Sequence, residues 1–332
     1  MNLCNKNYTV DIYQDYVNNL LIGQTASHIP VRSCRSNSPR TRTIKFSPPS
    51  EQQIQNVYWY DELKTIIKDA CAQGVLTDAI VHGSYGDFSQ TFFSDLEITL
   101  LLPSRTLNYK NEASALAKWI SQRLNPFLIK VDPLQHHAAF YLWSDLVEHY
   151  NENILPLDAY SAAWSMNAST LNFKVEIGID QYLSAQKFTQ TNHRLLESKK
   201  YFFRYGINPY SIKRFLSNFT LLPAFYFQAK GEEVSKKKAI YKMLKIGNSD
   251  IHAAIEAATY MRKTWPQTPL WLGSVRRQIV TSSIPSGHID LALSSLYRNK
   301  KVETYFRNDV LPVVMQACSS YLLLGKVLLD EN

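Results

Sequence analysis

The segment VHGS at residues 81–84 and the segment DLEI at residues 95–98, ten residues further on, decide the fold of this chain. Apolar runs flank both segments, so the sequence predicts two strands joined through a Gly-Ser turn. Successive side chains of a strand point to opposite faces, which places Asp95 and Glu97 together on one face. The apolar residues that alternate with them are expected to point into the core.

Asp95 and Glu97 form a carboxylate pair that calls for a cation, because two carboxylates this close repel each other unless a positive charge lies between them. A hard divalent ion, Mg²⁺ or Mn²⁺, relieves this repulsion and also binds phosphate oxygens. Gly83 lets the backbone approach a ligand closely, and Ser84 offers a hydroxyl group and an N–H group at the turn. These residues predict a metal-bound phosphate site suited to in-line attack on a nucleotide α-phosphate.

The pattern of Gly83, Ser84, a spacer of about ten residues, Asp95 and Glu97 resembles the nucleotidyltransferase superfamily related to DNA polymerase β. The Ser-Asp-x-Glu form at residues 94–97 is closest to the aminoglycoside and minimal nucleotidyltransferases. The resemblance implies Mg²⁺-dependent transfer of an NMP from an NTP, most readily ATP, to an acceptor hydroxyl. It also implies that Asp95 and Glu97 bind the metal and that Gly83 and Ser84 hold the phosphates.

The sequence departs from this superfamily at a third carboxylate, which is expected on a later strand. The run 138–143 has the character of that strand but contains no acidic residue. His137, directly before it, is our first candidate to take that place as a base or a metal ligand. The alternative for the histidines at 136 and 137 is that one caps the end of a strand and the other is solvated. Glu176, with Asp180 close behind, is a second candidate, for which an edge strand with solvated charges is the alternative. Asp132 is the nearest acidic residue before the run.

The order of elements predicts an α+β protein with a small mixed β-sheet, flanking helices and an α-helical C-terminal domain. We expect an N-terminal arm, partly disordered, over 1–50, a nucleotidyltransferase-like domain over 51–187 and a helical domain over 188–332. Strands are expected at 75–81 and 95–102, which flank the Gly-Ser turn, and at 127–131 and 138–143. Helices are expected from Ser50 to about Gly74, over 110–124, and in the segments 208–230, 235–246, 250–263, 270–280 and 288–326.

The net charge of +8 favours polyanionic partners, although scattered surface charge explains it equally well. The densest basic run follows Ser235, a predicted helix N-cap, and Lys237 or Lys238 is our choice for a lysine that binds the triphosphate. A solvated helix face is the alternative. Arg276 and Arg277 form a smaller patch with the same two interpretations.

Three functions remain open at this point. The first is an enzyme whose acceptor is a small molecule, RNA or a protein; a basic chain is a poor match for a polycationic antibiotic, which favours RNA or protein. The second is a catalytically silent nucleotide- or RNA-binding protein with the same fold, and the third is a helical interaction protein. Four dispersed cysteines and the lack of a long apolar run predict a cytoplasmic protein without a membrane partner.

Overall fold

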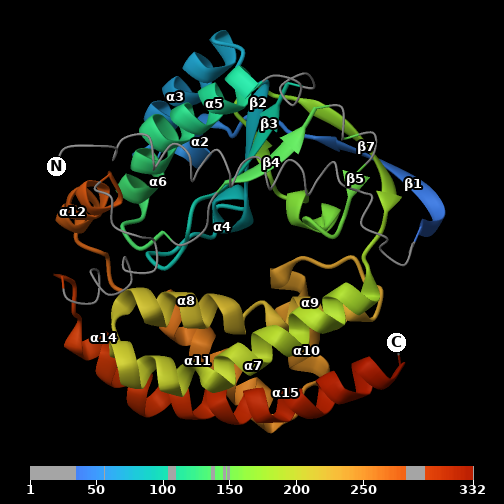
Figure 1. The fold of residues 1–332 in the computed structure, drawn as a ribbon, viewed down its shortest axis with the longest axis vertical. Helices are drawn as coiled ribbons and strands as arrows, with labels where there is room; N and C mark the ends of the chain where they lie inside the picture. The colour runs from blue at the N-terminus through green and yellow to red at the C-terminus, as the bar shows by residue number, and fades with distance from the viewer. Residues whose placement is uncertain are drawn as a thin grey trace.

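The computed structural model of the chain describes residues 35–55, 57–103, 110–135, 139–144, 147, 150–281 and 296–331. These residues form an N-terminal lobe, residues 35–177, which contains the sheets, and a helical lobe, residues 181–331 (Figure 1). The predicted α+β class is therefore confirmed.

The central sheet of the N-terminal lobe has four strands in the order β4-β3-β2-β6. Strand β2 runs antiparallel to both β3 and β6, whereas β3 and β4 are parallel, so the sheet is mixed as predicted. A second sheet has the order β1-β7-β5. The strands are β1 Arg35–Lys45, β2 Asp78–His82, β3 Glu97–Leu102, β4 Phe140–Trp143, β5 Tyr150–Asn151, β6 Trp164–Ser165 and β7 Thr170–Ile177.

Both faces of the central sheet are buried. Helices α3 (Tyr60–Ala72), α5 (Lys110–Trp119) and α6 (Asn125–Val131) cover one face (Figure 1), where the alternating residues Leu96, Ile98 and Leu100 of the β3 segment enter the core. Residues of the other parity, such as Ile80 and Leu101, pack against β7 of the second sheet. A strand covered on both faces reads as a nearly continuous apolar run, which explains the sequence of β3.

The strand expected at 127–131 is a helix instead. Residues Asn125–Val131 form α6, which continues from α5 through a π-helical turn at Ile120–Leu124. A short apolar run does not distinguish a strand from a buried helix. The helix expected over 110–124 does not end before Pro126, because this proline occupies the first turn of α6, where it loses no hydrogen bond.

Part of the expected arm is also structured differently from the prediction. Residues Arg35–Lys45 form β1, which pairs antiparallel with β7, and Phe46 at its end is fully buried. Thr41, Thr43 and Ile44 lie in the paired part of the strand, and β-branched residues favour this conformation. After it, Ser50 forms the predicted cap, a capping box with Gln53 at the start of α2 (Glu51–Ile54).

The helical lobe follows the predicted segments closely, because side-chain caps and prolines mark the helix starts. The first helix, α7, begins after its N-cap Asp180 and runs on through the expected domain boundary at 187/188. The helices are α7 Gln181–Tyr205, α8 Pro209–Phe219, α9 Leu222–Ala229, α10 Lys236–Ile246, α11 Ser249–Lys263, α12 Leu270–Thr281, α14 Lys300–Tyr305 and α15 Leu311–Glu331.

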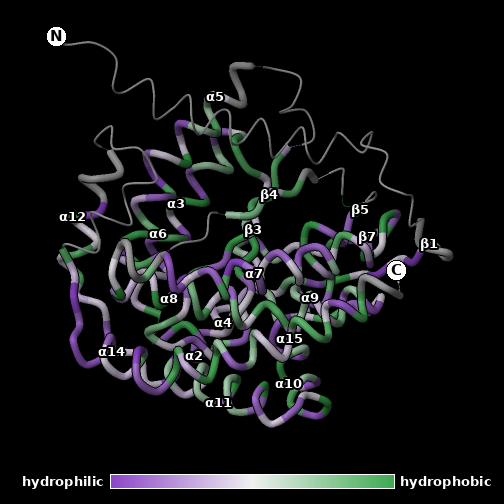
Figure 2. The backbone as a smooth tube through the Cα atoms, turned by 60° about the horizontal axis from the view of Figure 1, so that its bottom comes forward, coloured by the Kyte–Doolittle hydropathy of each residue, from purple (hydrophilic) through white to green (hydrophobic). Residues whose placement is uncertain are grey.

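Among the described helices, the run Lys300–Leu328 is long and apolar enough to cross a membrane, judged by length and composition alone. Val314, Cys318 and Tyr321 of this run are fully buried, and α15 packs against α7 and α11. Polar and apolar residues alternate through this lobe (Figure 2). One face of α15 thus belongs to the core of the helical lobe, whereas Leu322, Leu323 and Val327 are exposed and 33% of the apolar window of the run is buried. The fold is compatible with a soluble protein.

Candidate functional site

The site lies where the β2–β3 hairpin meets the helical lobe. His82 pairs with Glu97 at the end of the hairpin, and Asp95 precedes β3 by two residues. Leu96 and Ile98 are buried, so the predicted alternation of acid and apolar residues is confirmed. The four-residue helix α4 (Gly83–Gly86) follows β2 on the side of the N-terminal lobe that faces the helices (Figure 1).

Gly83 packs directly against the Glu97 carboxylate. Its φ of +67° lies in the left-handed region, which glycine adopts without steric cost. A Cβ atom at this position would lie 2.0 Å from Oε2 of Glu97. The close approach predicted for Gly83 therefore exists, but it is an approach to the carboxylate that the sequence assigns to the metal.

His82 lies beside Glu97 on the neighbouring strand β2. Its Nδ1 atom is 3.8 Å from Oε2 of Glu97, and its Nε2 atom is 3.1 Å from Oγ1 of Thr99. Thr99 in turn lies 3.1 Å from the hydroxyl group of Tyr160. Burial lowers the pKa of His82, while the charge of Glu97 acts in the opposite direction. A histidine in this setting is neutral near pH 7 and orients its neighbours through hydrogen bonds.

Asp95 belongs to a buried ion cluster that joins the two lobes. The Nζ atom of Lys213, on α8, is 2.7 Å from Oδ1 of Asp95 and also donates a hydrogen bond to Oδ2 of Asp132. All three side chains are almost completely inaccessible to solvent. Burial raises the pKa of Asp132 to about 7; Lys213 opposes this shift and the charge of Asp95 adds to it. Two carboxylates sharing one ammonium group therefore hold a proton more tightly than isolated ones.

The turn that carries Asp132 is fixed beside the hairpin by Gln135. The Gln135 side chain accepts a hydrogen bond from the Leu96 N–H at 3.2 Å and donates one to the Leu96 carbonyl at 3.3 Å. Leu96 lies between the two acidic residues of the motif, so Gln135 fixes the backbone that positions both. Asp132 caps its own turn by accepting the Leu134 N–H at 3.0 Å.

Two further cations of the helical lobe approach the carboxylate pair. Lys236, the first residue of α10, and Arg262, near the end of α11, are close enough for Asp95 and Glu97 to act on their charges. Burial lowers the pKa of each, and the two carboxylates oppose that shift. Three carboxylates thus face three cations, since Lys213 belongs to the same group.

Phe93 inserts between these cations. Its ring centroid is 5.0 Å from the Arg262 guanidinium carbon and 5.6 Å from the Lys213 Nζ atom. Although it belongs to the N-terminal lobe, Phe93 is part of the apolar core of the helical lobe, where Trp265 meets its ring edge-on at 5.1 Å. The loop before β3 is therefore built into both lobes.

The structure places the other predicted residues as follows. Lys237 is 2.5 Å from Oδ2 of Asp87, just after α4, and Lys238 pairs with Asp158, so both ammonium groups meet carboxylates of the N-terminal lobe. Their assignment to phosphate stays a prediction. His137 lies outside the described residues.

Neither alternative for the third carboxylate reaches the site. Glu176 is on the exposed side of β7, in the other sheet, with Lys174 3.8 Å away. Asp180 caps α7 by accepting the Leu183 N–H at 2.9 Å. Strand β4, parallel to β3, contains no acid, and Asp132 instead lies beside Asp95.

Comparison with protein-family models, with curated protein sequences and with solved structures finds no match for this chain.

A divalent cation fits the carboxylate pair on the evidence of its donors. Among the described residues there is no group of three or more histidine, cysteine, aspartate or glutamate side chains arranged around one point. Mg²⁺ does not require such a group, because proteins commonly bind it through one or two carboxylates together with substrate phosphates. Asp95 and Glu97 supply that number, and Gly83 leaves room for the Glu97 carboxylate at the mouth of the turn.

Sequence reasoning missed the cations, although one of them left a signal. Lys213 occurs on the apolar face of α8, in register with Pro209, Ile212 and Leu216, all of which are buried. A lysine on such a face requires a buried partner. No comparable signal marks Lys236 or Arg262. Arg276 of the smaller patch is buried and donates to the Pro133 carbonyl at 2.9 Å, whereas the Arg277 side chain lies outside the described residues.

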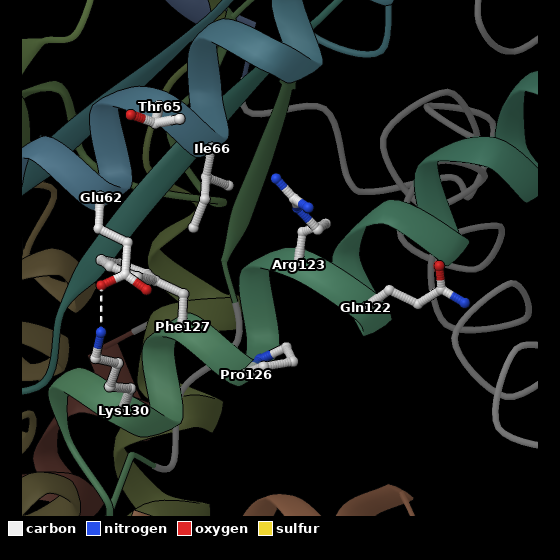
Figure 3. A pocket seen from close by; sticks show the side chains of 8 residues that line it. All are labelled: Glu62, Thr65, Ile66, Gln122, Arg123, Pro126, Phe127 and Lys130. Carbon is white, nitrogen blue, oxygen red and sulfur yellow. Dashed lines mark hydrogen bonds and ion pairs between the residues drawn. The ribbon is translucent and has the colours of Figure 1, made fainter.

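A pocket of about 360 Å³ lies elsewhere, between α3 and α6 (Figure 3). Glu62 of α3 and Lys130 of α6 form an ion pair there. Arg123 of the π-helical turn and Phe127 of α6 also line the pocket. None of the residues that line it belongs to the carboxylate and cation cluster.

Proposed function

We propose that this chain is a nucleotidyltransferase of the DNA polymerase β type. It binds an NTP between its two lobes and transfers the NMP to an acceptor hydroxyl, with Mg²⁺ or Mn²⁺ bound by Asp95 and Glu97. The observation that carries the proposal is that the Gly83 turn lies against Glu97 and that the charges of Glu97 and Asp95 act on Lys236 and Arg262 of the helical lobe. Two free thiols, Cys71 and Cys318, support a cytoplasmic location.

The carboxylates, the cations and the turn would each have a separate role in the proposed reaction. A metal bound at Asp95 and Glu97 would supply charge stabilisation for the phosphates. Lys236 and Arg262 face the same point from the opposite lobe, where they would neutralise the triphosphate and the leaving pyrophosphate. Gly83 and Ser84 offer backbone and hydroxyl groups to the phosphates at the turn. His82 and Gln135 keep the carboxylates in place without contacting the substrate.

A second candidate function is nucleotide binding without turnover. Lys213 favours it, since its ammonium group already compensates Asp95 and β4 offers no third acid. The two functions differ in whether pyrophosphate is released.

Glu97→Gln is expected to abolish transfer of the NMP, because the amide keeps the shape of the side chain but no longer neutralises a divalent ion. The measurement is release of pyrophosphate and transfer of label from each α-labelled NTP with Mg²⁺, in the presence of RNA, protein and small-molecule acceptors. Glu176→Gln is the matched control and should retain full activity, because Glu176 lies in the other sheet. Binding without pyrophosphate release in the wild type would favour the second function, and no binding at all would refute both.

Lys236→Met and Arg262→Met are each expected to weaken NTP binding by about 10- to 100-fold, the loss that follows removal of a charge-assisted contact. Lys237→Met and Lys238→Met provide the comparison, since both lysines pair with carboxylates of the N-terminal lobe. Titration of a fluorescent, non-hydrolysable ATP analogue measures all four. A larger loss at Lys237 or Lys238 would instead support the prediction from the sequence that one of these lysines binds the triphosphate.

A further inference from the structure

The position of Lys213 bears on how many metal ions the site binds. Its Nζ atom contacts both Asp95 and Asp132, so a single ammonium group lies at the point shared by two carboxylates from different segments of the N-terminal lobe. Two-metal phosphoryl-transfer sites use a second divalent cation about 3.5–4 Å from the first, and carboxylate oxygens are the ligands that such a cation prefers. We infer that Lys213 is a built-in cation that occupies the position of a second metal ion, so that the site binds one divalent cation with the nucleotide.

Geometry and burial support this inference. Lys213 is fully buried and Asp132 nearly so, and a buried charge is retained when it is paired and hydrogen-bonded. The ammonium group reaches the pair from α8, a rigid helix capped by Asn208 and packed through its apolar face. It is therefore a fixed charge, unlike an ion that exchanges with solvent. Glu97 lies against Gly83, and its Oε2 atom is 3.8 Å from Nδ1 of His82.

Lys213 acts through Asp95 and is a positioning residue. By holding Oδ1 of Asp95 it fixes the orientation of the carboxylate toward the proposed metal. This inference rests on the proposed function for the metal at Asp95 and Glu97. The cation between Asp95 and Asp132 can nevertheless be tested without nucleotide and without turnover.

The first experiment measures the temperature of thermal unfolding without nucleotide. Two samples are compared, one containing EDTA and the other containing millimolar Mn²⁺. Lys213→Met leaves the two carboxylates without their cation, so Mn²⁺ is expected to raise its unfolding temperature by about 5 °C. The wild type, Lys213→Arg and the control Lys245→Met, at an exposed position of α10, should show no comparable rise. The double variant Lys213→Met/Asp132→Asn should lose the Mn²⁺ effect, because one carboxylate of the pair is gone.

The second experiment does not depend on the folding of any variant. Bound Mn²⁺ is counted on the wild-type chain saturated with a non-hydrolysable ATP analogue, and one ion per chain is expected. Two ions per wild-type chain, or no stabilisation of Lys213→Met by Mn²⁺, would overturn the role of Lys213. Absence of nucleotide binding would refute the proposed function instead, and the unfolding experiment would still decide the role of Lys213.

Discussion

Gly83→Ala is expected to reduce the proposed nucleotidyl transfer by about a hundredfold, the effect of displacing a catalytic group by about an ångström. The new Cβ atom would lie 2.0 Å from Oε2 of Glu97, so the carboxylate has to move away from the turn. The free energy of unfolding should also fall by more than about 1–2 kcal/mol, which is the cost of an L-residue in the left-handed region. Urea unfolding and the rate of pyrophosphate release measure the two effects.

Gly74→Ala separates the two causes. Gly74 has a φ of +70° but nothing within 4 Å of the position that its Cβ would take, so this variant carries the backbone cost alone. The stability loss of Gly83→Ala should shrink to that of Gly74→Ala when Glu97 is also replaced by alanine. Equal losses for the two single variants would show that the Glu97 side chain moves off Gly83 without a measurable cost in stability.

Lys213→Met is expected to destabilise the metal-free protein by about 3–5 kcal/mol, because it leaves Asp95 and Asp132 buried without their shared cation. Chemical denaturation in EDTA measures this loss. Lys245→Met, on the surface of α10, should change the free energy of unfolding by less than about 1 kcal/mol. The double variant Lys213→Met/Asp132→Asn should recover part of the loss, since only one carboxylate then remains. A small loss in the single variant would contradict the ion cluster.

The loss in Lys213→Met should depend on pH in a defined direction. Burial and Asp95 raise the pKa of Asp132 from its ordinary value of 3.8 to about 7 even with Lys213 present, and removing the ammonium group raises it further. The folded state then binds a proton that the unfolded state has released, from about pH 4 to above pH 7. Stability therefore falls as pH rises through this range, and the variant should be markedly more stable at pH 6 than at pH 8.

Much of the fold could be predicted because the signals are local. The hairpin, the alternation around Leu96 and the helices after Asp180 follow from periodicity, caps and breakers. The failures arose where local signals were ambiguous. The run 127–131 is apolar and short, and Pro126 suits a helix start as well as a stop. Arg35–Lys45 became a strand because β7, about 130 residues later, offered a partner.

The site was predictable only on the side of the N-terminal lobe. Asp95, Glu97 and Gly83 are held together by one hairpin, so their spacing in the sequence fixes their proximity in space. The opposing cations come from α8, α10 and α11, and their convergence depends on how these helices pack. Sequence spacing contains no information about that packing. The apolar face of α8 indicates that Lys213 needs a buried partner, but it does not indicate which residue that partner is.

The separation of Lys213 from its partners has a consequence for synthesis on the ribosome. Asp132 and Lys213 are 81 positions apart, and Asp95 emerges earlier still. All described strands of the N-terminal lobe, up to β7, are therefore translated before any of the three cations. A nascent chain that ends before α8 contains Asp95 and Asp132 but not the ammonium group that pairs with both. Closure of the site therefore waits for α8, and translation itself sets the order in which the charges are matched.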